Sequence, residues 1–213
     1  MRDPIRRRRG FMLVLSSPSG AGKTTLSRRV LEQNSDFVMS VSATTRAPRQ
    51  GEVHGKDYYF VSPEEFEGMV QRGDFFEHAT VFSHRYGSPH DPVMKALDAG
   101  KSVLFDIDWQ GTQAISQRAR DDLVTVFILP PSMDDLAKRL KSRAQDSAEV
   151  VAARMAKAEG EISHWSEYDY VLVNDDVDAC ARALQHIIES ERLKRERQVW
   201  LLDFVRSLTG QKG

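Results

Sequence analysis

The stretch Ser17-Pro18-Ser19-Gly20-Ala21-Gly22-Lys23-Thr24-Thr25 follows directly after the apolar run 11–15 and precedes a helix-forming segment. It fits the phosphate-binding pattern Gly-x4-Gly-Lys-[Ser/Thr] at every position except the first, where Ser17 replaces glycine. Gly20 and Gly22 allow the backbone to curl so that its N–H groups point at phosphate oxygens. Lys23 is expected to reach the outer phosphates, and the Thr24 hydroxyl to bind Mg²⁺. We therefore expect residues 17–25 to hold a nucleoside triphosphate.

The composition predicts one soluble domain. The chain has 213 residues, of which 40% are hydrophobic, enough for one sizeable core with insertions. The net charge of -1 gives no reason to expect a nucleic acid or membrane partner. A single cysteine, Cys180, excludes an internal disulfide and is typical of a reducing compartment. No signal peptide or membrane-spanning run is visible, so we expect a cytoplasmic protein, with the arginine run at 6–9 solvated.

Short apolar runs alternate with helical patterns along the chain. The runs predict buried parallel strands at 11–15, 37–41, 102–107, 124–129 and 170–173. Helices are predicted between most of them, at 26–33, 91–99 and 133–143. The alternation predicts a three-layer α/β fold around a mostly parallel central sheet.

Two stretches interrupt this alternation. Residues 42–91 are rich in turn formers and short β-like pieces, with one helix predicted at 63–72, and indicate a small β-rich insertion. Residues 139–161 are charged and poor in apolar residues, which is typical of a mobile helical lid. We therefore expect a single domain whose core comprises 10–41, 92–138 and 162–213.

A long C-terminal helix is predicted from residue 177 to beyond residue 196. Further on, Val199, Leu202, Val205 and Leu208 recur at helical spacing and form an apolar stripe. We expect this stripe to dock on the body of the protein, and a contact in a homo-oligomer through the C-terminal helix is the alternative.

The insertion carries a second set of anion-binding side chains. Arg46 and Arg49 lie three residues apart, on either side of Pro48. Guanidinium groups suit a phosphate group bound from two sides, and the hydroxyls of Tyr58 and Tyr86 are further donors. We interpret these side chains as the site for the phosphate of a second substrate.

The order of motifs along the chain resembles the guanylate kinase family. The motifs are the phosphate-binding loop, Thr44-Thr45-Arg46-x-Pro48-Arg49-x-Gly51-Glu52, Gly55-Lys56-Asp57-Tyr58, Tyr86-Gly87-Ser88 and Asp106-Ile107-Asp108-x-Gln110-Gly111. The resemblance runs from about residue 10 to the C-terminal helix, nearly the whole chain. It implies phosphorylation of GMP by ATP, with a P-loop core, a GMP-binding insertion and a lid.

The resemblance also implies which residues read the base. In the family, the positions of Ser42, Glu77 and Ser88 contact guanine. A carboxylate accepts two hydrogen bonds from the N1–H and N2 amino edge of guanine, whereas adenine has a lone pair at N1 and no N2 amine. Sites of this kind reject the wrong partner by about 10⁴-fold, because a buried polar group is left unpaired.

Polar residues follow two of the predicted strands. Asp106 and Asp108 end the strand at 102–107, and the carboxyl ends of parallel strands form the ligand crevice of such folds. In the family these positions lie by Mg²⁺ and the GMP ribose, so either carboxylate is a candidate to reach the metal through water. A helix-capping role suits one of the two. Asn174, after the last strand, matches the family's adenine-side segment.

The predicted lid contributes three arginines. Arg139, Arg143 and Arg154 match arginines that close over the transferring phosphoryl group in the family. Preorganised cations stabilise the charge of the transition state more than that of the ground state. Ser142 and Ala144 stand where related sequences usually carry glycines, which predicts a stiffer lid hinge.

Three other functions fit these residues less well. A regulatory GTPase needs a guanine-reading Asn-Lys-x-Asp motif, and Asn174-Asp175-Asp176 lacks the lysine. A non-catalytic guanylate-kinase-like binding module loses the loop or the lid arginines, which are all present. A sugar-phosphate kinase of the same fold does not account for the three base-reading residues together. ATP and GMP are the expected substrates and Mg²⁺ the expected cofactor.

Overall fold

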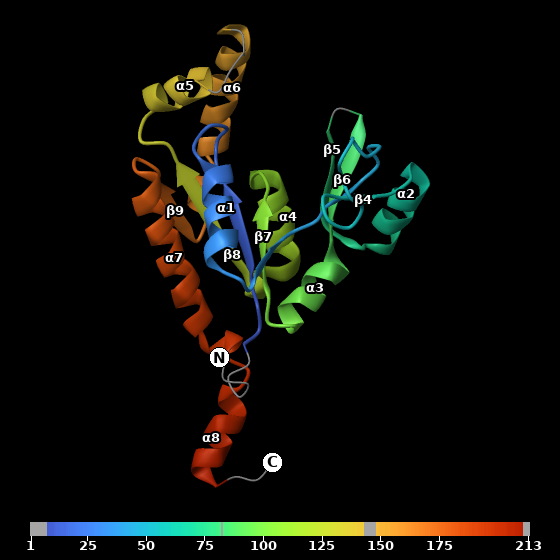
Figure 1. The fold of residues 1–213 in the computed structure, drawn as a ribbon, viewed down its shortest axis with the longest axis vertical. Coiled ribbons are helices and arrows are strands. Elements are labelled where there is room, and N and C mark those ends of the chain that lie inside the picture. Colours follow the sequence, from blue (N-terminus) through green and yellow to red (C-terminus); the bar gives the residue numbers. More distant parts are fainter. Residues whose placement is uncertain (1–7, 82, 143–147, 211–213) are drawn as a thin grey trace.

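A five-stranded parallel sheet forms the centre of the computed structural model, which describes residues 8–81, 83–142 and 148–210 (Figure 1). The strand order is β2-β7-β1-β8-β9, and every neighbouring pair runs parallel. The strands are β1 (Met12–Ser16), β2 (Phe37–Met39), β7 (Ser102–Asp106), β8 (Leu123–Leu129) and β9 (Tyr170–Val173). The three inner strands are buried almost throughout, because their continuous apolar runs are covered on both faces.

Helices cover both faces of this sheet. On one face, α1 (Lys23–Gln33) and α7 (Val177–Leu193) share an apolar cluster with β1 and β8. On the other face, α3 (His90–Asp98) and α4 (Trp109–Ala119) pack on β1 and β7. The predicted three-layer α/β fold is therefore confirmed.

A second, four-stranded sheet lies beside the main one (Figure 1). Its order is β4-β3-β6-β5, with bounds β3 (Ala43–Thr44), β4 (Tyr59–Phe60), β5 (Phe75–Val81) and β6 (His84–Pro89). Helix α2 (Pro63–Arg72) packs on it through Phe66, whose ring stacks on Phe75 with centroids 4.7 Å apart. The expected β-rich character of this region and its helix at 63–72 are both confirmed.

Two consecutive phenylalanines tie the small sheet to the main body. Phe75 is buried in the cluster of the small sheet, whereas Phe76 is buried in the α3–α4 cluster of the main sheet. Successive side chains of a strand point to opposite faces, so one strand serves both cores. The pairing register shifts between Phe75 and Glu77, and this irregularity lies beside the predicted base-reading carboxylate.

Two helices contribute to the region predicted as a lid, 139–161: the end of α5 (Met133–Ser142) and most of α6 (Ala148–Ile162). They pack together through Leu136, Leu140 and Ala158. Leu140 also lies close to the phosphate loop, because a Cβ added at Gly20 would come within 3.1 Å of its side chain. The predicted helix at 133–143 is confirmed as far as Ser142, and Arg143 lies outside the described residues.

The prediction of a single C-terminal helix is wrong. α7 ends at Leu193, a short 3₁₀ helix follows at Arg195–Arg197, and α8 (Leu201–Thr209) is separate. The break is held by Arg197, which is buried and donates a 3.1 Å hydrogen bond to Glu191. The carbonyl of Arg197 also accepts a 2.8 Å hydrogen bond from the backbone of Arg9, so the turn is tied to the start of the chain.

The expected docking of the apolar stripe on the body is also wrong. Val199, Leu202, Val205 and Leu208 are between 49% and 69% exposed, and α8 projects away from the rest of the described chain (Figure 1).

Other short 3₁₀ helices lie at Arg120–Asp122 and Trp165–Glu167. Within the described residues, no helix combines the length and apolar character needed to cross a lipid bilayer.

Candidate active site

The loop between β1 and α1 has the backbone of an anion-binding site. Gly20 and Gly22 have φ angles of 93° and 107°, in the left-handed region that favours glycine, and α1 begins at Lys23. Ser17 is not among the described residues with positive φ, and its hydroxyl donates a 3.0 Å hydrogen bond to the Pro18 carbonyl. Serine therefore replaces the first glycine of the pattern without backbone strain.

The loop lysine is held by the end of the central sheet. The Lys23 ammonium forms an ion pair with Asp106, the last residue of β7, and donates a 3.3 Å hydrogen bond to the Ile107 carbonyl. Both charged side chains are mostly buried, with 21% and 26% of their surface exposed. The structure thus joins the phosphate loop to the predicted acidic pair through Asp106.

The second carboxylate of that pair has a different position. Asp108 is the N-cap of α4, and its carboxylate accepts a 3.0 Å hydrogen bond from the backbone N–H of Gly111. Capping satisfies one of the free N–H groups of a helix start. The two aspartates therefore differ in what they contact: Asp106 contacts the loop lysine, and Asp108 the helix.

A cavity of about 460 Å³ lies beside the phosphate loop. Arg139 and Asn174 line it, and the guanidinium of Arg139 donates a 2.9 Å hydrogen bond to the Asn174 carbonyl. The amide of Asn174 donates a 2.7 Å hydrogen bond to the Ala21 carbonyl. These two predicted residues are thus brought to the loop, whereas Arg154 is exposed on α6 and is not in the lining of this cavity.

A second cavity, of about 260 Å³, lies between the two sheets. Ser42, Tyr58 and Ser88 line it from the small sheet and its loops, and Asp106 from the main sheet. These four predicted residues are distant in sequence, and the fold brings them to one enclosed space. Asp106 also pairs with Lys23, so this ion pair links the second cavity to the phosphate loop.

Glu77 is fixed beside the second cavity by its strand partner. It faces Ser88 in the β5–β6 register, and the Ser88 hydroxyl donates a 2.6 Å hydrogen bond to Oε1 of Glu77. Burial raises the pKa of Glu77, and the Ser88 hydrogen bond partly offsets that rise. The site therefore holds a poorly solvated carboxylate that gains from further hydrogen-bond donors.

The predicted phosphate-binding side chains form a cluster around Arg46. Its guanidinium donates to both carboxylate oxygens of Glu52, at 2.7 and 3.0 Å, and lies 5.3 Å from the ring centroid of Tyr58. The rings of Tyr58 and Tyr86 have centroids 6.0 Å apart. Arg49 contributes its backbone N–H to Glu52 at 2.7 Å and leaves its side chain exposed.

Comparison with known proteins decides the family. The guanylate kinase family profile matches residues 9–191 of the chain. The chain belongs to the guanylate kinase family. A guanylate kinase of Paramagnetospirillum magneticum is 61% identical over 207 residues, covering 97% of each chain. One of Bradyrhizobium diazoefficiens is 60% identical and covers 96% of this chain and 93% of the relative.

A solved structure supports the same family. The crystal structure of guanylate kinase from Anaplasma phagocytophilum has a TM-score of 0.72 and 40% sequence identity to the chain. The alignment covers 95% of this chain and 97% of that one. Family membership and the phosphate loop together show a nucleotide-binding kinase.

Several residues that support this site in the guanylate kinase fold are not predicted from the sequence. Below the loop, the hydroxyls of Ser16 and Thr112 lie 3.1 Å apart, and Tyr168 donates to Thr112 at 3.2 Å. Glu52 belongs to a quoted motif, but its role as the partner of Arg46 appears only in the structure. The sequence signal for this role is the position of Glu52, an acidic residue three positions after Arg49 and six after Arg46.

A further unforeseen contact links α4 to the region after α6. The rings of Trp109 and His164 stack with centroids 3.6 Å apart and an interplanar angle of 10°. His164 contacts Glu167 at 2.6 Å, and Gln113 donates to Glu167 at 2.7 Å. Trp109 directly follows the cap residue Asp108, so the stack ties the base of the lid helices to the start of α4.

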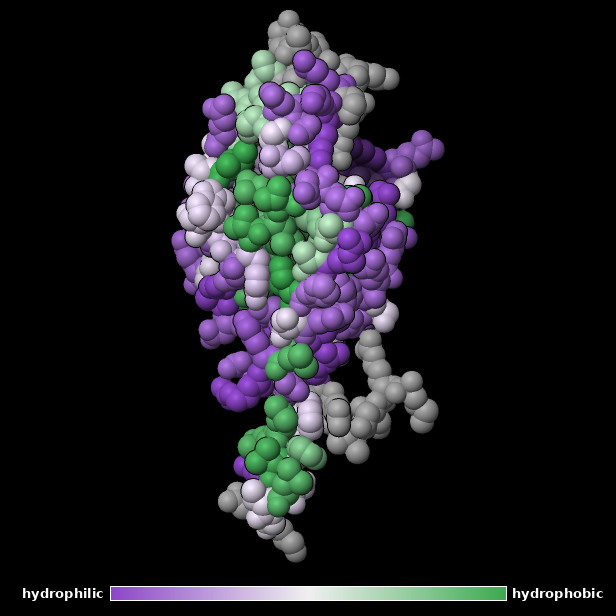
Figure 2. Space-filling view, turned by 90° about the vertical axis from the view of Figure 1, so that its left-hand side faces the viewer, coloured by the Kyte–Doolittle hydropathy of each residue, from purple (hydrophilic) through white to green (hydrophobic). Residues whose placement is uncertain are grey.

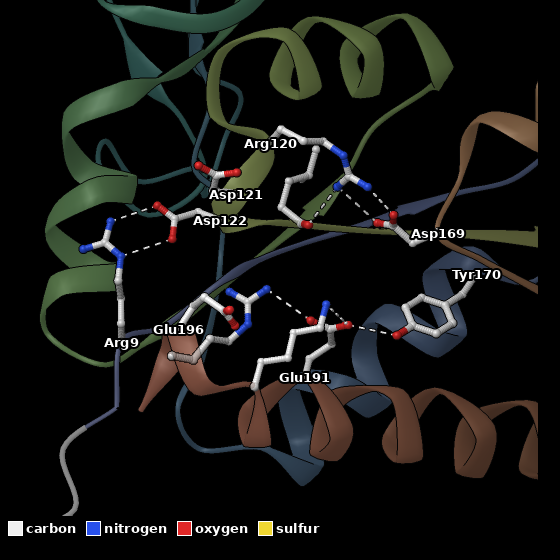
Figure 3. A pocket seen from close by; sticks show the side chains of 11 residues that line it. Arg9, Arg120, Asp121, Asp122, Asp169, Tyr170, Glu191 and Glu196 are labelled. Carbon is white, nitrogen blue, oxygen red and sulfur yellow. Dashed lines mark hydrogen bonds and ion pairs between the residues drawn. The ribbon is translucent and has the colours of Figure 1, made fainter. Parts of the chain in front are cut away.

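A larger cavity, of about 980 Å³, lies elsewhere, at the amino ends of β8 and β9 (Figure 3). Its charged residues pair with one another, Arg9 with Asp122 and Arg120 with Asp169 (Figure 3). The catalytic crevice of such a sheet lies at its carboxyl ends. The candidate active site is therefore at the two smaller cavities, one lined by glycines of the phosphate loop and the other by Asp106, the partner of the loop lysine.

Proposed function

We propose that the two cavities bind ATP and GMP and that the site between them transfers the γ-phosphoryl group of ATP to GMP. One observation carries this assignment: Asp106 lines the second cavity and also pairs with Lys23 of the phosphate loop. The donor and acceptor phosphates are thereby directed to the same place. Holding two reactants in this way supplies a large part of the rate enhancement of such reactions.

On the donor side, residues 17–25 surround the phosphates and Asn174 lies on the adenine side. The backbone N–H groups of the loop and the N-terminal end of α1 favour the negative phosphates. Lys23 exchanges Asp106 for phosphate oxygens when ATP binds. Asn174 holds the loop through its 2.7 Å hydrogen bond to the Ala21 carbonyl, so nucleotide contact and loop geometry are coupled.

Mg²⁺ fits the oxygen donors on this side. Mg²⁺ is usually held by one or two carboxylates with substrate phosphates and water rather than by an all-protein cage. The Thr24 hydroxyl and the Asp106 carboxylate would hold the ion, because Asp108 is engaged as the cap of α4. When bound, Mg²⁺ neutralises charge on the transferring phosphates.

On the acceptor side, Glu77 accepts hydrogen bonds from the N1–H and N2 amino groups of guanine, beside Ser42 and Ser88. Arg46, with Arg49, Tyr58 and Tyr86, holds the GMP phosphate. Glu52 orients the guanidinium of Arg46 before GMP arrives, which lowers the cost of binding. Asp108 supports the site from the start of α4, near the ribose.

The lid arginines are proposed to stabilise the charge that spreads over the transferring group. Arg139 already lies at the donor cavity, and Arg143 and Arg154 are assigned the same role from their place in the family motif. Closure of residues 139–161 and of the insertion 42–91 over the substrates would exclude water. A general base is not required, because the attacking phosphate oxygen is already ionised.

We also propose a cytoplasmic location, with ATP and GMP as partners and neither nucleic acid nor a membrane. The single buried cysteine supports a reducing compartment. Self-association through the C-terminal helix is a separate proposal, because α8 projects from the end of the molecule opposite α5 and α6 (Figure 1).

A coupled assay of ADP formation tests the proposed function. GMP, AMP, UMP and no acceptor are compared at equal concentrations, with the wild-type chain and with Lys23→Ala. We expect rapid ADP formation with GMP alone, and a loss of about 10²-fold or more in Lys23→Ala. Arg72→Ala, an exposed arginine of α2 that pairs with Asp74, is the matched control. Equal turnover with AMP and GMP would contradict the assignment.

A further inference from the structure

α8 is an apolar helix whose large side chains are mostly exposed in the described chain, although the ring centroid of Phe204 lies 5.3 Å from that of Trp200, directly before the helix. Leu202, Phe204, Val205 and Leu208 are 60%, 44%, 49% and 69% exposed, and none of the α8 residues is buried. Figure 2 shows these side chains gathered on α8, apart from the apolar area of the body. Isolated helices of this length are marginal in water, and helices in proteins gain most of their stability by packing an apolar face. A packing surface from outside the monomer would supply that stability.

The sequence of α8 is chemically palindromic. From 201 to 208 it reads Leu-Leu-Asp-Phe-Val-Arg-Ser-Leu. A two-fold axis at the midpoint between Phe204 and Val205 pairs each residue with a suitable counterpart. Phe204 is paired with Val205, and both are apolar. Asp203 is paired with Arg206, of opposite charge, and Leu201 with Leu208. The pair formed by residues 202 and 207 is the exception. A two-fold interface needs this property, because each residue must suit its counterpart in the second copy.

The two charges of α8 are available for such a contact. Asp203 and Arg206 lie 3.8 Å apart within the helix, and their side chains are 87% and 45% exposed. In an antiparallel pair, each Asp203 lies opposite the partner subunit's Arg206, so opposite charges meet twice. A parallel pair would instead place two aspartates together and two arginines together.

We propose that α8 is a self-association surface, which pairs antiparallel with α8 of a second copy of this chain about a two-fold axis between Phe204 and Val205. The helix lies at the end of the molecule away from α5 and α6, so the pair leaves both candidate active sites open (Figure 1). A nine-residue helix is only about 14 Å long. The contact is therefore smaller than a standard interface of about 1,600 Å², and the dimer forms in a concentration-dependent equilibrium.

Sedimentation equilibrium of the full chain over a wide concentration series tests this proposal. We expect the wild-type mass to rise toward that of a dimer, and Val205→Asp to raise the dissociation constant by about tenfold or more. Asp203→Arg and Arg206→Asp should each weaken the dimer, because like charges then face each other. Glu32→Arg, at an exposed position on α1, is a matched control for the change of charge.

Mixing the two charge variants gives the sharpest result. In a heterodimer of Asp203→Arg with Arg206→Asp, an arginine faces an aspartate at both contacts, so the mixture should dimerise although each variant alone does so weakly. In the double variant the two charges are exchanged, and it should dimerise like wild type. Kinase activity should be unchanged in all of these variants, which separates this proposal from the proposed function. A monomer mass throughout the series, a dimer indifferent to Val205→Asp, or monomeric binding to phospholipid vesicles would overturn the proposal.

Discussion

Ser88 donates a 2.6 Å hydrogen bond to Oε1 of Glu77, which faces it across the β5–β6 pair. One carboxylate oxygen is thereby fixed by the protein before any substrate arrives. Burial disfavours the charged form of Glu77, so the carboxylate gains most from a ligand that brings two donors. Guanine has those donors on one edge and adenine does not.

This contact predicts a shift in the pH dependence of GMP use. Glu77 must be ionised to accept two hydrogen bonds, so the KM for GMP rises as pH falls through the pKa of Glu77, which burial has raised. Ser88→Ala removes a donor that favours the ionised form. The rise in KM should therefore begin at a higher pH in Ser88→Ala than in wild type, as measured from KM against pH.

Two comparisons make that result specific. Protonation of the GMP phosphate affects the KM of wild type and of Ser88→Ala equally, so its effect cancels when the two plots of KM against pH are compared. The KM for ATP should keep the same pH dependence in both. Superimposable GMP profiles would show that Ser88 does not tune Glu77.

Arg46 and Glu52 predict a graded loss of GMP affinity. Arg46→Ala removes a charged donor to phosphate and should raise the KM for GMP while lowering kcat, with a loss in kcat/KM of about 10²-fold. Glu52→Gln keeps Arg46 but removes the charge that orients it, so the KM should rise by about tenfold with a smaller change in kcat. Steady-state kinetics at saturating ATP measures both. An Arg46→Ala enzyme with normal KM for GMP would refute the phosphate assignment.

Gly22 predicts a steric coupling between the loop and Asn174. A Cβ at Gly22 would lie 2.2 Å from the amide nitrogen of Asn174, and the φ of 107° strains any other residue. Gly22→Ala should therefore displace Asn174 and raise the KM for ATP by about tenfold or more, at little change in the KM for GMP. Gly160→Ala is the control, because a Cβ there meets nothing within 4 Å. It should leave activity intact.

The Trp109–His164 stack predicts an optical signal that reports on the lid base. In a Trp165→Phe, Trp200→Phe background, Trp109 is the remaining tryptophan. His164→Ala removes the stacked ring, so the fluorescence of Trp109 should change, and kcat should fall several-fold with the KM for GMP retained. His186→Ala, a histidine on α7, should alter neither. Unchanged emission in His164→Ala would contradict the stacked geometry.

The sequence predicted the layered fold because its signals are local. Continuous apolar runs in 102–107 and 124–129 gave buried strands, and the glycine-rich loop had a fixed place between a strand and a helix. The prediction of a single C-terminal helix was wrong because the break depends on contacts between residues distant in the sequence. Arg197 is buried against Glu191, and its carbonyl is tied to Arg9 at the other end of the chain. Helical periodicity carries no information about such contacts.

The site was predictable to the extent that motifs specify it. Lys23 and Arg46 are assigned from motif positions and Glu77 from the family resemblance, but their partners are seen only in the fold. The contrast between Asp106 and Asp108 is an example, since one pairs with the loop lysine and the other caps α4. Asp106 ends β7 and Asp108 lies two residues further on, directly before α4, and the sequence alone does not show which of them contacts the loop lysine.

The central claim is that Glu77 selects guanine at a site joined to the phosphate loop. The most direct test is the ratio of kcat/KM for GMP to that for AMP, in wild type and in Glu77→Gln. We predict a wild-type ratio of about 10⁴ that falls by about 10²-fold or more in Glu77→Gln, mainly through loss of GMP use. A ratio unchanged by Glu77→Gln would contradict the account.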